Sequence, residues 1–135
     1  MSNLLKGKLV VVYLLTIALG SVGVAVRAFI VHYFGLLGPI APYWATISIN
    51  IIGSFFMGIL YTSSLLGQPD VWRLWRIPLG VGFLGGLTTF STFTLDIYRL
   101  IEAGTIEMGL FYLFLSIIGG LVALWFGMLC AHYLF

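Results

Sequence analysis

Charged residues are scarce in this chain, which has only six basic and four acidic side chains among 135 residues, or 7%. A soluble domain carries roughly 25% charged residues. Hydrophobic residues make up 61% of the sequence, so there is too little polar surface to cover a water-soluble globule. We therefore predict an integral membrane protein with one domain over residues 1–135. The net charge of +2 is too small to indicate nucleic-acid binding.

Cysteine and catalytic motifs are also nearly absent. The single cysteine, Cys130, excludes an intrachain disulfide and a cysteine-rich metal site. His32 and His132 have no second histidine or carboxylate at ligand spacing. The chain has no Gly-x-Ser-x-Gly, His-Glu-x-x-His or Walker-type motif, and no pair of carboxylates inside an apolar run. We therefore expect a protein that is not an enzyme.

Long hydrophobic runs are what the chain does have. A membrane-spanning helix needs about 20 mostly apolar residues. Four segments meet this requirement, at about residues 9–31, 45–66, 77–100 and 108–134. The first is preceded by a short basic stretch but has no clear cleavage site after it, so it is predicted to be an uncleaved span. The short connections make successive helices alternate in direction, which places both termini on one side of the membrane.

The distribution of Lys and Arg sets the orientation of these spans only weakly. With the N-terminus inside, four basic residues face the cytoplasm and two lie toward the other side. The first group is Lys6, Lys8, Arg73 and Arg76, and the second is Arg27 and Arg99. So small a bias is compatible with insertion in both orientations.

The third apolar segment contains an unexpected polar stretch at residues 83–93, Phe-Leu-Gly-Gly-Leu-Thr-Thr-Phe-Ser-Thr-Phe. Lipid offers no water to satisfy backbone or hydroxyl groups, so such a stretch must face protein or an aqueous path. Each glycine lowers helix stability by roughly 1 kcal/mol. We expect the helix to break at Gly85 and Gly86 and to free backbone carbonyls, which bind alkali cations in the broken helices of transporters.

The residues after this break suggest a path for an anion. If the helix restarts near Thr88, Phe90 and Phe93 share one face. The hydroxyls of Thr88, Ser91 and Thr92 then lie on a neighbouring face. Hydroxyls donate hydrogen bonds to anions, and aromatic rings have a positive edge. Packing of the rings, with hydroxyls bonded to carbonyls four residues back, is the simpler explanation of each residue alone, but the density of the cluster favours the anion path.

Polar side chains also occur in the other apolar segments, where their cost makes them functional candidates. Thr46 and Asn50 share a helix face, as do Tyr112 and Ser116, because each pair is four residues apart. An interhelical hydrogen bond would also explain Asn50. Arg27 lies late in the first span, where it can either snorkel to the interface or line an aqueous vestibule. Glycines at helical spacing indicate close helix contacts, either within one chain or between subunits.

Together these motifs resemble the Fluc/CrcB family of fluoride-specific ion channels over essentially the whole chain. The most specific signature is residues 82–93, Gly-Phe-Leu-Gly-Gly-Leu-Thr-Thr-Phe-Ser-Thr-Phe. Thr46-x-x-x-Asn50-x-x-Gly53 and the glycine and arginine pattern of residues 20–27 support it. The resemblance implies a multi-pass protein of the bacterial plasma membrane, with four transmembrane helices per subunit and the third broken at the Gly-Gly-Leu-Thr motif. It also implies an antiparallel dual-topology homodimer with two pores.

The resemblance further assigns roles to individual residues. It implies a structural sodium ion that is not transported, bound by the backbone carbonyls of Gly85 and Thr88 at the dimer centre. The pore residues that it implies are Asn50, Phe90, Phe93, Ser91, Thr92, Thr46 and Tyr112, with Arg27 near the vestibule. One position departs from the family pattern, because many members carry a glutamate where this chain has the shorter Asp96.

The function implied is passive export of cytoplasmic fluoride down its electrochemical gradient, which lowers fluoride toxicity. The implied partners are fluoride, a second copy of the chain and the lipid bilayer. The alternative is a small proton-coupled exporter of the multidrug-resistance type, but such an exporter needs a membrane-embedded carboxylate and the first span has no Asp or Glu. A membrane scaffold that transports nothing would explain the glycines but not Asn50 or the hydroxyl cluster.

Overall fold

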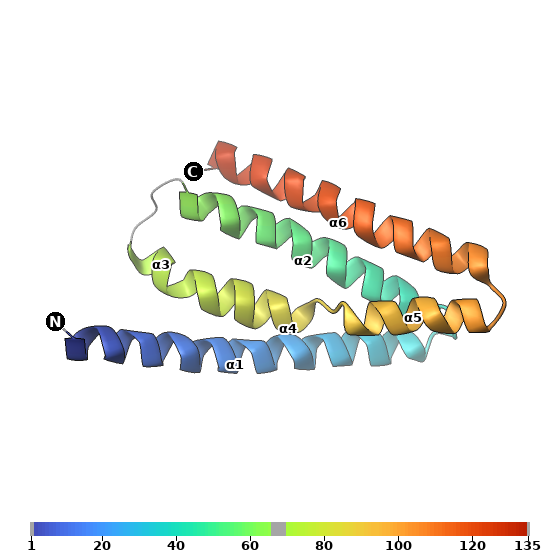
Figure 1. The fold of residues 1–135 in the computed structure, drawn as a ribbon, viewed down its shortest axis with the longest axis horizontal. Helices are drawn as coiled ribbons and strands as arrows, with labels where there is room; N and C mark the ends of the chain where they lie inside the picture. Colours follow the sequence, from blue (N-terminus) through green and yellow to red (C-terminus); the bar gives the residue numbers. More distant parts are fainter. Residues whose placement is uncertain (1, 66–69, 135) are drawn as a thin grey trace.

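The computed structural model describes residues 2–65 and 70–134 and contains only helices within them (Figure 1). The two N-terminal helices are α1 (Ser2–Gly35) and α2 (Ala41–Leu65). Next come α3 (Asp70–Ile77), the π-helix η1 (Pro78–Leu84) and the short α4 (Gly85–Leu87), which follow one another without a gap. After an interruption the chain continues as α5 (Ser91–Glu102) and α6 (Ile106–Leu134).

The prediction of four membrane spans is confirmed. The described residues contain four helical stretches that are long and apolar enough to cross a membrane. These stretches are Lys6–Gly35, Ala41–Ser63, Leu74–Glu102 and Ile106–Leu134. The observed helices extend beyond the predicted bounds by a few residues at most ends, as expected when polar residues continue a helix into the interface. Residues 67–76, which the sequence left as a connection between the second and third spans, are helical from Asp70 onward as α3. Residues 66–69 are outside the described residues.

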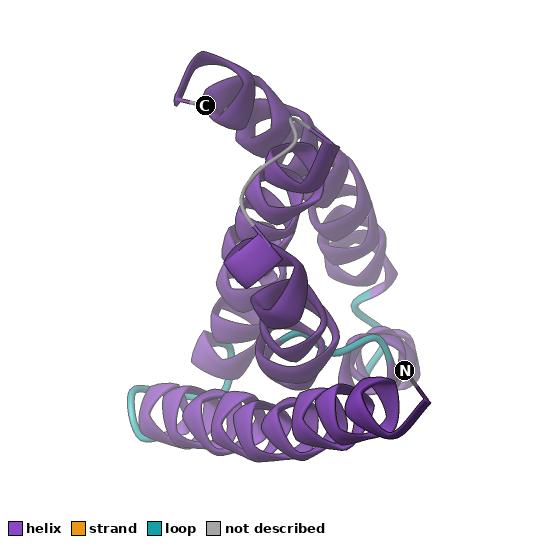
Figure 2. Cartoon of the chain, turned by 90° about the vertical axis from the view of Figure 1, so that its left-hand side faces the viewer, coloured by secondary structure: helices purple, strands orange, loops and turns teal. Residues whose placement is uncertain are grey.

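The helices pack as two pairs. α2 lies along α6, whereas α1 lies along η1 and α4, so that α1 and α6 occupy opposite edges of the molecule (Figures 1 and 2). α5 packs against α6 and contacts α2. The start of α1 and the end of α6 lie at the same end of the bundle, as the short connections predict (Figure 1).

The third span is irregular in two places. At Pro78 the helix widens into η1, because proline has no N–H to donate to the preceding turn. The interruption itself comes later than predicted: Gly85 and Gly86 are helical, and regular structure stops at Thr88, whose backbone is extended (φ −79°, ψ 156°). The helix restarts at Ser91 rather than near Thr88.

Close packing, and not a break, explains the helical glycines Gly82 and Gly86. A Cβ atom at Gly82 would lie 2.6 Å from the carbonyl oxygen of Thr16, and one at Gly86 would lie 2.5 Å from the carbonyl oxygen of Gly20. Neither distance is tolerable for a real side chain, so these glycines let η1 and α4 lie directly on the backbone of α1. The sequence left open whether such glycines pack within one chain or between subunits. At these two positions the contacts are within one chain.

A second close crossing joins α2 to α6 and gives a test of the packing. A Cβ atom at Gly127 would overlap the carbonyl oxygen of Phe55. We expect Gly127→Ala to destabilise the protein by about 1–3 kcal/mol, the usual cost of overpacking. The measurement is the thermal unfolding midpoint in detergent, followed by circular dichroism.

Gly7→Ala is the matched control, because nothing lies within 4 Å of a Cβ atom built at Gly7 in α1. Alanine is favoured over glycine in a helix by about 1 kcal/mol, so this variant should unfold at the wild-type midpoint or above it. Equal midpoints for Gly127→Ala and the wild type would contradict the close crossing.

Candidate functional site

The interruption between α4 and α5 is the site around which the predicted functional residues gather. Its backbone leaves the helical conformation at Thr88 and returns to it at Phe90 (φ −91°, ψ −37°). Such an interruption at membrane depth leaves peptide groups without helical partners, and these must be satisfied by other parts of the protein. The partners come from α1 and α2, which flank the interruption.

Asn50 of α2 binds the peptide groups on both sides of Thr89. Its side-chain Oδ1 accepts a hydrogen bond of 3.0 Å from the Thr89 N–H, and its Nδ2 donates one of 3.3 Å to the Thr89 carbonyl oxygen. A carboxamide presents one acceptor and two donor hydrogens, so one N–H of Asn50 remains for another partner. The interhelical hydrogen bond that the sequence allowed is thus present, and it is made to backbone.

Arg27 of α1 reaches the same interruption from the other side. Its Nη1 donates a hydrogen bond of 3.4 Å to the carbonyl oxygen of Thr88. The guanidinium is therefore turned toward the interior of the molecule and does not snorkel away from it. Two neighbouring peptide groups are thus held by side chains from two different helices.

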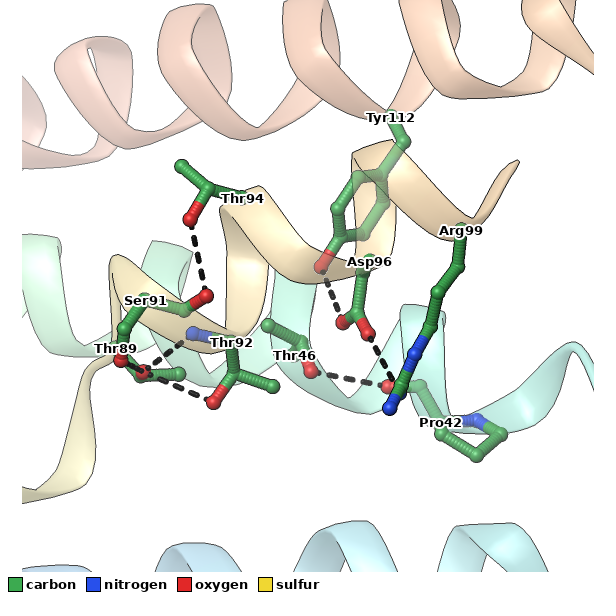
Figure 3. A network of polar contacts seen from close by, with 9 residues as sticks. All are labelled: Pro42, Thr46, Thr89, Ser91, Thr92, Thr94, Asp96, Arg99 and Tyr112. Atoms are coloured by element: carbon green, nitrogen blue, oxygen red, sulfur yellow. Dashed lines mark hydrogen bonds and ion pairs between the residues drawn. The ribbon is translucent and has the colours of Figure 1, made fainter. Parts of the chain in front are cut away.

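The hydroxyls of the interruption bond mostly to one another and to backbone (Figure 3). The Thr89 hydroxyl donates to Thr92 Oγ1 over 3.2 Å and accepts from the Thr92 N–H over 3.2 Å. The second bond satisfies one of the free N–H groups at the start of α5, as an N-cap side chain does. Ser91 Oγ lies 3.4 Å from Thr89 Oγ1, and the exposed Ser91 remains open to other partners.

A row of aromatic rings begins at the interruption and runs into the bundle. The ring centroids of Phe90 and Phe93 are 5.8 Å apart, and those of Phe93 and Tyr112 are 5.3 Å apart. Phe90 is 76% exposed in this single chain, whereas Phe93 is 4% and Tyr112 2% exposed. The prediction that the two phenylalanines share a face is confirmed, and Tyr112 of α6 extends that face.

The phenol of Tyr112 is held by a buried carboxylate (Figure 3). Tyr112 Oη donates a hydrogen bond of 3.2 Å to Asp96 Oδ2, and Arg99 Nη1 lies 3.9 Å from Asp96 Oδ1. Asp96 is only 6% exposed, so it does not simply face headgroup water. Asp96 acts on the aromatic row by fixing the position of Tyr112.

Thr46 of α2 lies close to Tyr112 and Asp96 (Figure 3). Its side chain is 1% exposed and its hydroxyl donates to the carbonyl oxygen of Pro42 over 3.1 Å. The hydroxyl proton is therefore donated within α2, to a carbonyl four residues back, as is common for threonines in membrane helices. Among the predicted hydroxyls, that of Thr88 is used in the same way, donating to the Leu84 carbonyl oxygen over 2.9 Å.

A cavity of about 300 Å³ lies beside the interruption, between α2, α5 and α6. No charged side chain among the described residues lines it. Its lining residues are Asn50, Gly53, Ser54, Met57, Thr88, Thr89, Phe90, Phe93, Ser116, Ile117 and Leu124. The cavity brings together four residues of the predicted pore and metal sites (Asn50, Thr88, Phe90 and Phe93), whereas Arg27, Thr46, Gly85, Ser91, Thr92 and Tyr112 lie outside its lining.

Ser116 is a functional candidate that the predicted set of site residues missed. Its Oγ is buried against the cavity and has no hydrogen-bond partner in the described part of the chain. An unpaired buried hydroxyl costs free energy unless a water or a ligand binds it. The signal in the sequence was its position one helical turn after Tyr112. Thr89 was missed as well, although the pair Thr89 and Thr92 has the spacing of an N-terminal cap.

Side-chain metal ligands are absent from the described residues, which hold no group of three His, Cys, Asp or Glu side chains that could bind a metal ion. Backbone oxygens are a different matter. In a regular α-helix the Thr89 N–H would bond the Gly85 carbonyl, but here it donates to Asn50. The Gly85 carbonyl and the second lone pair of the Thr88 carbonyl are thus candidate oxygen ligands.

Comparisons with known proteins place the chain among its relatives by sequence. A family model described as CrcB-like protein, Camphor Resistance (CrcB), matches residues 14–128. A relative from Pseudomonas fluorescens (strain Pf0-1) is 48% identical over 86 residues, which cover 64% of this chain and 68% of the relative. One from Azotobacter vinelandii is 41% identical over 110 residues, covering 82% and 88%. One from Stutzerimonas stutzeri is 38% identical over 113 residues, covering 84% and 90%.

All three relatives bear the name fluoride-specific ion channel FluC, which is the name of a channel and not of an enzyme. Their bacterial origin and the four described spans identify a multi-pass bacterial membrane protein. Because the family model covers most of the sequence and the relatives match it over the same spans, the chain belongs to the CrcB family of membrane proteins.

Proposed function

We propose that this protein is a fluoride channel that lets cytoplasmic fluoride leave the cell passively. The observation that carries the proposal is the uncharged cavity at the interruption, which is lined by Asn50, Phe90 and Phe93 and by Ser116, whose hydroxyl has no partner among the described residues. The names of the relatives supply the ion. An anion needs donors at such a place, and the cavity offers donors without a full charge.

The lack of charge suits conduction rather than tight binding. An ion that passes must be bound strongly enough to enter and weakly enough to leave. Hydroxyl and amide donors replace part of the water shell of fluoride, and ring edges present only partial positive charge. A fixed cation in the cavity would trap the anion instead.

The direction of flow follows from the chemistry of the ion. Fluoride enters a cell as neutral HF, which dissociates at cytoplasmic pH, so the anion accumulates inside. An inside-negative membrane potential drives an anion outward by about 2.3 kcal/mol per 100 mV. An open pore therefore suffices for export, and no coupled energy source is required.

A second copy of the chain completes this pathway. Phe90 is 76% exposed and the cavity is open in one copy, so a partner surface is needed to enclose the path from lipid. The antiparallel arrangement suits the weak charge bias of the sequence, with four basic residues toward one side and two toward the other. Each copy then contributes one interruption at the centre of the dimer.

A structural sodium ion fits the oxygens of the interruption. Carbonyl oxygens are ligands that hard cations prefer, and the interruption offers those of Gly85 and Thr88. One copy supplies too few of them for a sodium ion, and an antiparallel second copy would double the number. A bound sodium ion would supply a positive charge beside the uncharged anion path and offset part of the cost of dehydrating fluoride.

The proton-coupled exporter is less compatible with the site. Among the acidic residues whose side chains the structure describes, Asp96 alone is buried. Its two oxygens face Tyr112 and Arg99 and do not line the cavity. A transported proton needs a carboxylate that exchanges it with the substrate path, and this one is committed to positioning Tyr112.

Replacement of Phe93 tests the aromatic part of the path. Phe93→Ile keeps an apolar side chain but removes the ring edge, so we expect fluoride efflux from proteoliposomes to fall at least about tenfold, or about 1.4 kcal/mol in the barrier. Efflux is measured with a fluoride electrode on protein that remains monodisperse. Phe114→Ile is the matched control, because Phe114 of α6 is 64% exposed and lies outside the cavity.

Two outcomes would contradict the proposal in different ways. Near-normal fluoride efflux through Phe93→Ile would remove the support for conduction along ring edges. Chloride leaving wild-type proteoliposomes as readily as fluoride would refute fluoride specificity itself.

Sodium removal tests the structural cation. With sodium replaced by N-methylglucamine on both sides of the membrane, we expect fluoride efflux to fall and the unfolding midpoint of the protein to drop, because the oxygens of the interruption lose their shared ligand. Radioactive sodium should not cross with fluoride. Sodium flux coupled to fluoride would indicate a cotransporter instead, and an unchanged midpoint together with unchanged efflux would show that no structural sodium is bound.

A further inference from the structure

We propose that Asn50 and Gly53 of α2 together form a seat that positions the interruption. Within it, Gly53 sets the distance between the interruption and α2. Hereafter the α2 seat means these two residues. The seat holds two successive residues of the interruption, Thr88 and Thr89, by two different physical means. Asn50 forms hydrogen bonds with the backbone N–H and carbonyl of Thr89, and Gly53 leaves room for the methyl group of Thr88.

The first means is directional. Asn50 accepts from the Thr89 N–H over 3.0 Å and donates to the Thr89 carbonyl oxygen over 3.3 Å, so both bonds hold only while the backbone of Thr89 stays close alongside α2. A shift of the interruption away from α2 weakens both bonds together. Asn50 therefore fixes orientation, but it needs the backbone of Thr89 to come close.

The second means is steric, and it sets how closely the backbone of the interruption approaches α2. Gly53 lies one helical turn after Asn50, and a Cβ atom built on it would overlap the Cγ2 methyl of Thr88. The next nearest atom, Thr88 Cβ, would lie at 3.8 Å, which is ordinary van der Waals contact. The whole conflict is thus with a single methyl group.

That methyl group cannot simply turn aside. Thr88 Oγ1 donates to the Leu84 carbonyl oxygen over 2.9 Å, which fixes the side-chain rotamer of this β-branched residue. Rotating the methyl away from α2 would move the hydroxyl and break this bond. A side chain at position 53 must therefore push the backbone of Thr88 outward, and with it the Thr89 peptide that Asn50 holds.

Gly53 differs in this respect from the glycines that pack on backbone, of which Gly58 is an example. At Gly58, a Cβ atom would overlap the backbone carbonyl oxygen of Leu124, and no substitution of a side chain relieves a clash with backbone. At Gly53 the obstacle is a side-chain methyl, which one conservative substitution removes. Thr88→Ser deletes the methyl and keeps both the hydroxyl and the backbone carbonyl.

This inference rests on the proposed function only for its conduction readout. The test is a double-mutant cycle of Gly53→Ala and Thr88→Ser, measured as fluoride efflux from proteoliposomes. We expect Gly53→Ala to slow efflux at least about tenfold in the wild-type background, and less than about threefold when Thr88→Ser is the background. The rate of Thr88→Ser alone serves as the reference of the second comparison, whatever its value.

A second readout does not depend on conduction. Hydrogen exchange of the backbone amides of residues 88–92, measured by mass spectrometry, should speed up in Gly53→Ala as the Thr89 N–H loses Asn50, and return to the reference rate in the double variant. Gly58→Ala is the matched control: it should destabilise the protein, and Thr88→Ser should not rescue it.

The possible failures are distinguishable. Equal effects of Gly53→Ala in both backgrounds, in efflux and in exchange, would overturn the seat while wild-type conduction still supported the channel. Rescue of Gly58→Ala by Thr88→Ser would also overturn it, because the rescue would then not act through the methyl contact. Wild-type protein that conducts no fluoride would refute the proposed function, and the exchange readout would still decide the seat.

Discussion

The two hydrogen bonds between Asn50 and the Thr89 peptide groups are the interaction on which the site depends. A chain that leaves the helical conformation inside lipid exposes an N–H and a carbonyl that no water can satisfy, at a cost of several kcal/mol for each group. The carboxamide of Asn50 offers a donor and an acceptor in the same spacing as a peptide. It therefore replaces the missing helical partner without introducing a charge.

The absence of charge on the Asn50 side chain determines the character of the rest of the site. Because no charged side chain is needed to stabilise the interruption from α2, the neighbouring cavity remains uncharged and is lined by hydroxyls and rings. The guanidinium of Arg27 contacts the Thr88 carbonyl from the α1 side, and Arg27 does not line the cavity. Close contacts at glycines hold α1 against η1 and α4. Similar contacts hold α6 against α2, so the two pairs of helices enclose the irregular segment.

The membrane spans could be predicted from the sequence because each is a long apolar run, and hydropathy alone identifies such runs. The place of the interruption could not. The intrinsic helix propensity of Gly85 and Gly86 favours a break there, but both are helical. At Gly86 the backbone of α1 packs directly on the glycine, and this tertiary contact overrides propensity. The true interruption depends on Asn50, which lies 39 residues before its partner Thr89, and no local pattern reveals such a pairing.

The candidate site was predictable in part for the same reason. Phe90 and Phe93 share a face because helical spacing is a local property, and the structure confirms it. The contact of Asp96 with Tyr112 joins two helices, and the unpaired hydroxyl of Ser116 becomes visible only when the cavity is built. The widening of the helix at η1 also escaped prediction, since a proline inside a span usually indicates a kink.

The most direct test of the account is fluoride efflux through Asn50→Leu protein that remains monodisperse and inserts into liposomes. Leucine has a similar size but can neither donate nor accept, so the Thr89 peptide loses both partners. Efflux should fall to less than about a tenth of the wild-type rate, because loss of buried partners costs more than about 1.4 kcal/mol. Efflux near the wild-type rate would contradict it.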